Sequence, residues 1–160
     1  MKTKETLRLE QAILNHFDKI GTLVCVEVKI GNTTSKSILT DKTEIVDVMV
    51  CEPTTTIRCL KIKTRLSDFK SKQALSFYGD YNYLVIPDYL LDPIKDLDAF
   101  KDALWNEIGV ITVNEISRLT TYHKILSFGS HAALLESMTR SLARNAKKYY
   151  QQYYKRLENN

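Results

Sequence analysis

The sequence predicts an α/β fold, in which a mixed sheet carries flanking helices and a long helix ends the chain. Three apolar segments joined by short polar connections come first, as is typical of antiparallel strands. Two further strand-like segments each follow a helix-like segment, which favours parallel pairing. From about residue 130, apolar residues recur at helical spacing and strand formers disappear. The length of 160 residues fits one domain.

The N-terminal half alternates clear periodic patterns with turn residues. A helix is predicted over residues 3–19, because apolar side chains recur there every three or four positions and Gly21 ends the pattern. Residues 33–42 are polar and predict a loop, and Pro53 with two threonines predicts a tight turn. Strands are expected on either side of these connections, over residues 22–30, 44–51 and 56–63.

The second half begins with Ser67, a favourable N-cap, which predicts a helix that ends at Gly79. Strands are expected over 81–86, stopped by Pro87, and over 109–113, and helices over 93–105, with Pro93 in the first turn, and over 130–157. We therefore divide the chain into an α/β core, residues 1–129, and a basic, tyrosine-rich C-terminal helix, residues 130–160, in the same domain or as an appendage.

Composition limits the class of protein. The net charge of +4 and pI near 8.9 permit binding to a polyanion without requiring it. No apolar run approaches the roughly 18 residues of a membrane helix, and the polar N-terminus shows no secretory signal, so a cytoplasmic location without membrane contact is expected. The three cysteines lie in strand-like segments and are predicted to be buried, reduced thiols.

Other catalytic patterns are missing from the sequence. The three histidines, His16, His123 and His131, have no acidic partner at catalytic spacing, which gives no support to a nucleophile–histidine mechanism. No glycine-rich phosphate loop is present, and no cysteine or histidine spacing predicts a zinc site.

The predicted hairpin over residues 44–63 carries the most informative residues. Asp47 lies on its first strand, and Lys61 and Lys63 lie on its second. Residues two apart on a strand point to the same face, so the two lysines are expected to flank one site. A carboxylate can hold Mg²⁺ and a lysine can stabilise a developing phosphate charge. Taken alone, an Asp followed by Lys-x-Lys is a weak signal, and an ordinary hairpin also explains it.

This hairpin, with Ser67-Asp68-Phe69, the basic segment after it and the aromatic strand Tyr81–Ile86, resembles the PD-(D/E)XK nuclease superfamily, and in particular small MmcB-like DNA-repair and phage-type proteins. The resemblance covers about residues 5–114. It implies a restriction-endonuclease-like core and Mg²⁺- or Mn²⁺-dependent hydrolysis of DNA. By this resemblance Asp47 and Glu10 would serve the metal and Lys63 would steady the attacking water.

Lys61 departs from the superfamily pattern, because it stands where the motif has an acid. Three interpretations follow: an inactive site in which the lysine fills the cation position and still holds phosphate; an active site in which Glu10, Glu27 or Asp68 replaces the missing acid; or a substitution made to inactivate an enzyme. A second Glu-x-Lys, at Glu27 to Lys29, is interpreted as solvent-facing alternation on a strand.

Basic residues gather in two places. After Met138 there are six basic side chains and one acidic one, and Arg140, Arg144, Lys147 and Lys148 share a helical face. The same helix carries Tyr149, Tyr150, Tyr153 and Tyr154, which could stack on unpaired bases or pack on the sheet or a partner. The second group precedes and follows Ser67 and consists of Arg65, Lys70 and Lys72.

These observations predict a DNA-binding protein of the PD-(D/E)XK nuclease type, with hydrolysis impaired by Lys61. The alternative is a non-catalytic module that binds DNA or a protein, such as a phage-type inhibitor. The C-terminal helix is also expected to serve a homodimer or a protein partner.

Overall fold

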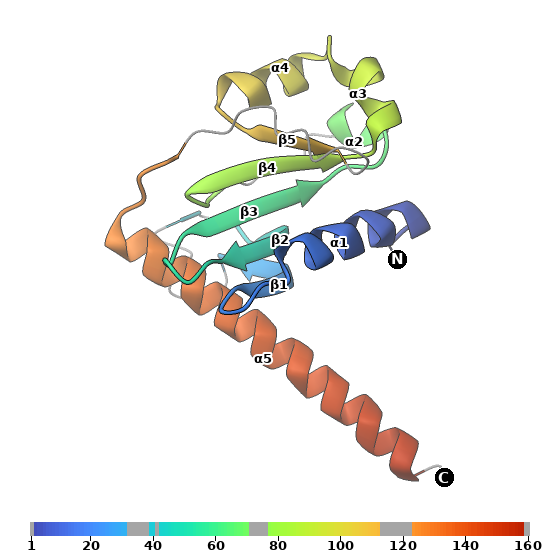
Figure 1. Cartoon of the computed structure of the whole chain (residues 1–160), viewed down its shortest axis with the longest axis vertical. Helices are drawn as coiled ribbons and strands as arrows, with labels where there is room; N and C mark the ends of the chain where they lie inside the picture. Colours follow the sequence, from blue (N-terminus) through green and yellow to red (C-terminus); the bar gives the residue numbers. More distant parts are fainter. Residues whose placement is uncertain (1, 32–38, 41, 71–76, 113–122, 159–160) are drawn as a thin grey trace.

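The computed structural model describes residues 2–31, 39–40, 42–70, 77–112 and 123–158. Figure 1 shows a mixed sheet of five strands with helices against it and a long C-terminal helix, α5, that extends beyond the sheet. This arrangement confirms the predicted α/β class.

The sheet has the strand order β1-β2-β3-β4-β5. β1 pairs antiparallel with β2, and β2 pairs antiparallel with β3. β3 and β4 are parallel, as are β4 and β5, so the predicted change from hairpins to crossover connections is confirmed. The strands are β1 (Leu23–Ile30), β2 (Glu44–Cys51), β3 (Ile57–Ile62), β4 (Tyr81–Ile86) and β5 (Gly109–Thr112).

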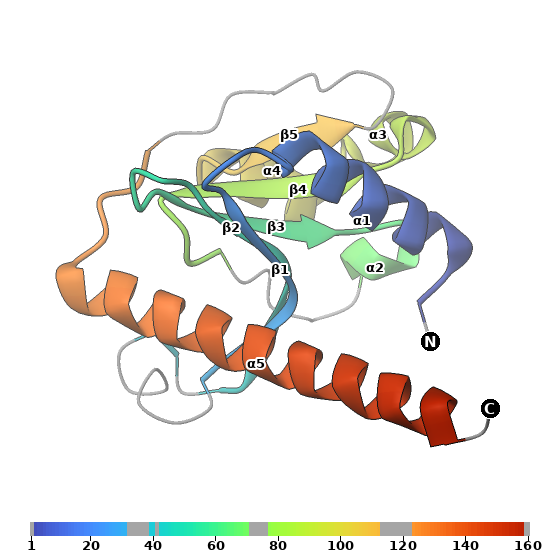
Figure 2. The same cartoon turned by 60° about the horizontal axis from the view of Figure 1, so that its bottom comes forward.

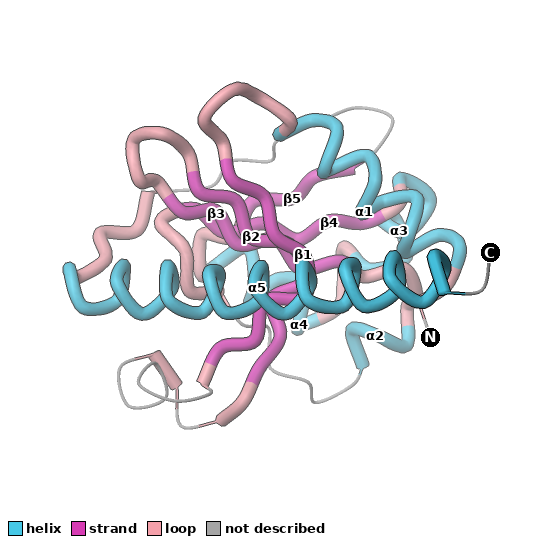
Figure 3. The backbone as a smooth tube through the Cα atoms, turned by 90° about the horizontal axis from the view of Figure 1, so that it is seen from below, coloured by secondary structure: helices cyan, strands magenta, loops and turns pink. Residues whose placement is uncertain are grey.

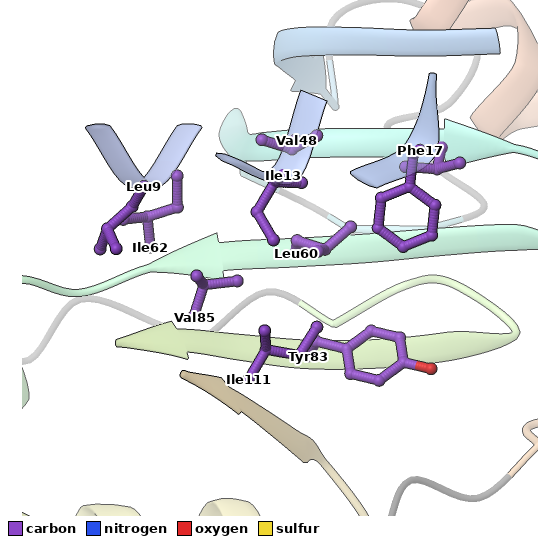
Figure 4. Close-up of a cluster of buried hydrophobic side chains, with 10 residues drawn as sticks. Leu9, Ile13, Phe17, Val48, Leu60, Ile62, Tyr83, Val85 and Ile111 are labelled. Atoms are coloured by element: carbon purple, nitrogen blue, oxygen red, sulfur yellow. The ribbon is translucent and has the colours of Figure 1, made fainter. Parts of the chain in front are cut away.

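Helix α1 (Lys4–Phe17) covers one face of the sheet (Figure 2). The hydroxyl of Thr3 caps its N-terminus by accepting a hydrogen bond from the backbone N–H of Thr6 at 3.1 Å. Figure 4 shows the side chains that α1 buries at helical spacing and the strand residues beneath them, which are Leu9, Ile13, Phe17, Val48, Leu60, Ile62, Tyr83, Val85 and Ile111.

The opposite face is shared by two groups of helices. The first half of α5 (Phe128–Glu158) packs on β1 and β2 through Leu134 and Met138 (Figure 3). Three shorter helices lie at the other end, where their side chains pack with β4 and β5: α2 (Ser67–Lys70), α3 (Asp88–Ile94) and α4 (Asp98–Trp105). Lys61 follows Cys59 on this face of β3, and Lys63 comes directly after the strand.

Two predicted helices differ in the structure. The single helix expected over 93–105 is wrong: α3 begins at Asp88, directly after Pro87, and α4 begins at Asp98. Pro93 therefore lies within the last turn of α3 and not in a first turn. The helix after Ser67 is described to Lys70, and most of its predicted remainder, residues 71–76, lies outside the described residues, as do most of the predicted loop residues 33–42.

At Glu27 in β1, and opposite it in β2, the side chains switch from one face of the sheet to the other. This residue has a φ of 53°, a left-handed conformation that costs energy for a side chain other than glycine. Val26 packs towards α1, whereas Val28 lies in the cluster beneath α5, so the regular alternation is interrupted at Glu27. Glu27 and Lys29 are both exposed, as expected. The neighbouring pairs, Val26 with Val48 and Val28 with Val46, place Glu27 across from Asp47. Both acidic residues therefore lie where the two strands deform.

All three cysteines are free and buried, as predicted, and they belong to one hydrophobic cluster. Burial raises the pKa of Cys25 and Cys51, and it raises the pKa of Cys59 to about 12. The thiolate is the reactive form, and burial and the raised pKa disfavour it. We therefore expect the colorimetric thiol reagent DTNB to label the native protein at least about 100-fold more slowly than it labels the protein in denaturant. Rapid labelling of native protein at three thiols would contradict this core.

Candidate functional site

Asp47 and its neighbours form a small charged cluster at one end of the β2–β3 hairpin. The Asp47 carboxylate accepts the backbone N–H of Ile62 at Oδ2, at 2.8 Å. Lys61 Nζ lies 3.6 Å from the same oxygen and donates to the carbonyl of Ile45 at 2.8 Å. The carboxylate thus supplies the acceptor for a backbone N–H of β3 that lies just beyond the last β2–β3 pair, Val48 with Leu60.

Lys63 lies beside this cluster but is buried, with 4% of its surface exposed. Its ammonium donates to the backbone carbonyl of Asp68 at 3.2 Å. Burial lowers the pKa of Lys63, and repulsion from Lys61 adds to the lowering against the attraction of Asp68 and Asp47. Asp47 and Lys63 therefore lie within electrostatic reach of each other, and the Lys63 ammonium is held by the backbone carbonyl of Asp68.

Glu10 has a different partner from the one the resemblance implies. Its carboxylate accepts a hydrogen bond from Lys2 Nζ, which also lies 3.1 Å from Glu27. Burial opposes the charged form of Lys2, but hydrogen bonds with Glu10 and Glu27 raise its pKa. The hydrogen bond from Lys2 in turn lowers the pKa of Glu27. Lys2 thereby joins the first helix to the deformed part of β1.

The donor set around Asp47 does not fit a Mg²⁺ centre. The Asp47 carboxylate already receives an N–H and faces an ammonium, and Mg²⁺ needs oxygen ligands in octahedral geometry. An ammonium about 4 Å from a dication costs roughly 8 kcal/mol at an effective dielectric near 20, before solvent screening reduces it. Within the described ranges, no group of three or more His, Cys, Asp or Glu residues is placed to hold a metal ion.

Removing the Asp47 carboxylate tests its structural role. In Asp47→Ala the backbone N–H of Ile62 loses its acceptor and Lys61 loses its counter-ion. We expect the free energy of unfolding to fall by about 1–3 kcal/mol, measured by urea denaturation. Asp92→Ala, which removes an exposed partner of Lys95, is the matched control and should change it by less than about 0.5 kcal/mol. An equal, small change in both variants would contradict the role assigned to Asp47.

The second half of α5 carries a continuous basic surface, which we call the cationic face: Arg140, Arg144, Lys147, Lys148 and Lys155. At about 100° per residue these five side chains fall on one side of the helix. Arg144 donates to the backbone carbonyl of Glu27 at 3.0 Å, and Arg140 pairs with Glu136 at 2.8 Å. Lys147, Lys148 and Lys155 are exposed. The cationic face therefore begins beside β1 and continues onto the projecting part of the helix (Figure 1).

The four tyrosines of α5 do not pack on the sheet. Their exposed fractions are between 48% and 64%, and every residue from Ala146 to Glu158 is exposed. Tyr150 stacks on Tyr154, with ring centroids 6.5 Å apart, and these two rings border Lys147 in a shallow surface hollow. Among the described residues, the alternative in which these tyrosines pack on the sheet is therefore wrong.

The predicted basic group near Ser67 is only partly described. Arg65 is exposed, and its backbone N–H donates to the Asp68 carboxylate, which also accepts from Thr64. Lys70 is the last residue of α2, and Lys72 lies outside the described residues. Arg65 thus remains as an exposed cation close to the Asp47 cluster.

The structure also brings together an acid and two histidines that sequence spacing did not connect. Asp80 Oδ2 lies 2.8 Å from His131 Nε2, and Asp80 Oδ1 lies 3.8 Å from His123 Nε2. Asp80 is buried and accepts the backbone N–H of Ile57 at 2.8 Å. The expectation that these histidines lack an acidic partner is therefore wrong. His131 is 51 residues from Asp80, and only the folding of α5 onto the sheet joins them.

Comparison with known proteins bears on the fold. No protein-family model matches the chain, and no curated protein matches it. A similar solved structure is a protein of unknown function from Silicibacter pomeroyi, with a TM-score of 0.68 and 18% identity over 96% of each chain. At this identity the likeness shows a shared fold alone. Separately, no described helix combines the length and apolarity needed to cross a membrane.

Proposed function

We propose that this chain is a DNA-binding protein of the PD-(D/E)XK nuclease type that holds the phosphate backbone without hydrolysing it. The observation that carries the proposal is the cationic face of α5, where five basic side chains share one side of a helix. Phosphate contacts supply most of the affinity of sequence-independent DNA binding, and they come mainly from Lys and Arg.

The position of the cationic face supports binding by charge. Residues after Met138 carry six basic and one acidic side chain, whereas the whole chain has a net charge of only +4. The net positive charge of the chain is therefore concentrated in the C-terminal part of one helix, where a polyanion can approach without displacing packed side chains. Five phosphate contacts on duplex DNA predict a slope of about −4.5 in a plot of log K against log salt.

The nuclease-type assignment rests on the order of β-strands and on the hairpin residues. A sheet of two antiparallel pairs followed by two parallel pairs, with Asp47, Lys61 and Lys63 at the end of β2 and β3, agrees with the resemblance seen in the sequence. The non-hydrolytic part rests on Lys61. Its ammonium occupies the neighbourhood of the Asp47 carboxylate, which is the cation-filled arrangement among the three interpretations of this residue.

Two assays on the full chain test the proposal together. Binding is measured by fluorescence anisotropy with a labelled duplex and with a single-stranded oligonucleotide, and cleavage by incubation with supercoiled plasmid plus Mg²⁺ or Mn²⁺. The expected result is binding without nicking. Lys61→Glu, which restores an acid at the motif position, is tested in parallel for both properties.

Each outcome has a clear consequence. Nicking by the unaltered protein would contradict the non-hydrolytic proposal and favour the interpretation in which another acid replaces Lys61. Nicking by Lys61→Glu alone would support a nuclease scaffold inactivated at this position. Absence of binding to either DNA at moderate salt would overturn the proposal and favour a protein partner.

A further inference from the structure

α5 carries an apolar stripe on the side away from both the sheet and the cationic face. Leu142 and Tyr149 lie seven residues apart, and so do Ala146 and Tyr153. Leu135 and Thr139 extend the two series towards the start of the helix, where Leu135 packs against the cluster beneath α5. The two series interleave at alternating spacings of four and three, which is the pattern of a coiled-coil seam. We define the tyrosine stripe as the exposed part of this side of the helix: Leu142, Ala146, Tyr149, Tyr150, Tyr153 and Leu157.

The tyrosine stripe has no cover within the described part of the chain. Tyr149, Tyr150 and Tyr153 are 64%, 55% and 48% exposed, and Leu142 and Leu157 are 37% and 57% exposed. With about 200 Å² on a free tyrosine, the three tyrosines of the stripe expose roughly 330 Å². Contiguous apolar patches of this size are often functional.

The distribution of charge separates this stripe from the proposed DNA contact. None of its six residues is charged. Lys148 and Lys155 lie on the other side of the helix, Lys147 borders Tyr150 at one edge of the stripe, and Arg156 follows Tyr149 by seven residues near the end of the helix. A phosphate backbone is therefore expected to approach the cationic face and leave the tyrosine stripe uncovered. The natural occupant of the stripe is a neutral, apolar surface with the same repeat.

We infer that the tyrosine stripe pairs with the same stripe of a second copy of this chain, forming a two-fold symmetric dimer through α5. A heptad seam is self-complementary, so one copy supplies the surface that the other needs. Two copies would bury about 670 Å² of tyrosine surface, and the leucines extend this to about 1,000 Å², the lower limit for stable interfaces. This inference does not depend on DNA binding.

The fold leaves room for such a pair. The second half of α5 extends past the sheet, so a partner helix can lie along it without meeting the body (Figures 1 and 2). The cationic faces of both copies would remain on the outside of the pair. The dimer would thus carry two basic surfaces on one rigid rod.

The test is the molar mass of the full chain in solution, measured by size-exclusion chromatography with light scattering. At about 100 µM, well above the micromolar Kd expected for a small interface, the mass should be twice 18.5 kDa. The double variant Tyr149→Glu, Tyr153→Glu places four charges in the seam of a dimer and should be monomeric, with unchanged helix content by circular dichroism. Gln151→Glu, Gln152→Glu adds the same charge outside the stripe and should remain dimeric.

A monomeric unaltered protein at this concentration would overturn the inference, as would an equal loss of dimer in both double variants. Binding of a single-stranded oligonucleotide to the same variants identifies the other occupant. If the tyrosine variant loses oligonucleotide affinity about tenfold or more and no mass change accompanies it, the stripe contacts bases and not a second copy.

Discussion

Reversing three lysines of the cationic face, Lys147, Lys148 and Lys155 to Glu, is expected to weaken DNA binding at least about 100-fold. Each exposed phosphate contact contributes on the order of 1 kcal/mol, and a glutamate at the same position adds repulsion. These side chains are exposed on the projecting part of α5, so their replacement leaves the core unchanged. Arg144 is kept, because it donates to the carbonyl of Glu27 and joins α5 to β1.

A matched variant separates a local contact from a general effect of net charge. Lys19, Lys95 and Lys101 are exposed lysines on other elements, and their reversal to Glu changes the net charge by the same amount. We expect this control to lose less than about tenfold in affinity, since long-range attraction is screened beyond about 8–10 Å at physiological salt. Equal losses in the two triple variants would contradict a specific role of the cationic face.

The largest expected effect on stability is that of Asp80→Ala. The buried carboxylate accepts the N–H of Ile57, at the start of β3, and pairs with His131, in the first turn of α5. Its removal leaves a buried N–H without an acceptor and breaks the hydrogen bond with the partly exposed His131. We expect the free energy of unfolding to fall by about 3–5 kcal/mol, and the Tm by about 6–20 °C, measured by chemical and thermal denaturation.

Two controls give this prediction its specificity. His131→Ala removes the half-exposed partner alone and should cost less than Asp80→Ala, because Ile57 keeps its acceptor. Asp96→Ala removes an exposed carboxylate and should change stability by less than about 0.5 kcal/mol. If Asp80→Ala costs no more than the Asp96 control, the buried pair does not hold α5 to the sheet.

The elements of the sheet were accessible from sequence because their signals are local. β2 and β4 match their predicted ranges, and the long C-terminal helix matches within two residues at its start and one at its end. The split between α3 and α4 was missed because Pro93 was interpreted as a helix start. A proline inside a helix removes one backbone hydrogen bond, here the one to the carbonyl of Tyr89, and α3 ends one residue later, at Ile94.

The chemistry of the site was less accessible, since it depends on contacts between distant segments. Spacing placed Asp47 and Lys61 on one hairpin, and the structure brings their side chains together. Spacing could not show that Lys63 would be buried, or that Lys2 would bridge Glu10 and Glu27.

The Asp80 cluster is not predictable from sequence for a related reason. No local pattern indicates that the chain brings His123 and His131 next to Asp80. Gly79 was a visible signal, interpreted only as a helix stop. A Cβ at this position would lie 2.8 Å from the carbonyl oxygen of Ile57, so glycine is what allows the chain to approach β3 closely before Asp80.

The salt dependence of DNA affinity tests the placement of phosphates on α5 most directly. Kd for a labelled duplex is measured across a series of salt concentrations for the unaltered protein and for the neutral variant Lys147→Gln, Lys148→Gln, Lys155→Gln. Three lost phosphate contacts should reduce the magnitude of the slope of log K against log salt by about 2.7. An unchanged slope would contradict contact between the DNA backbone and the cationic face.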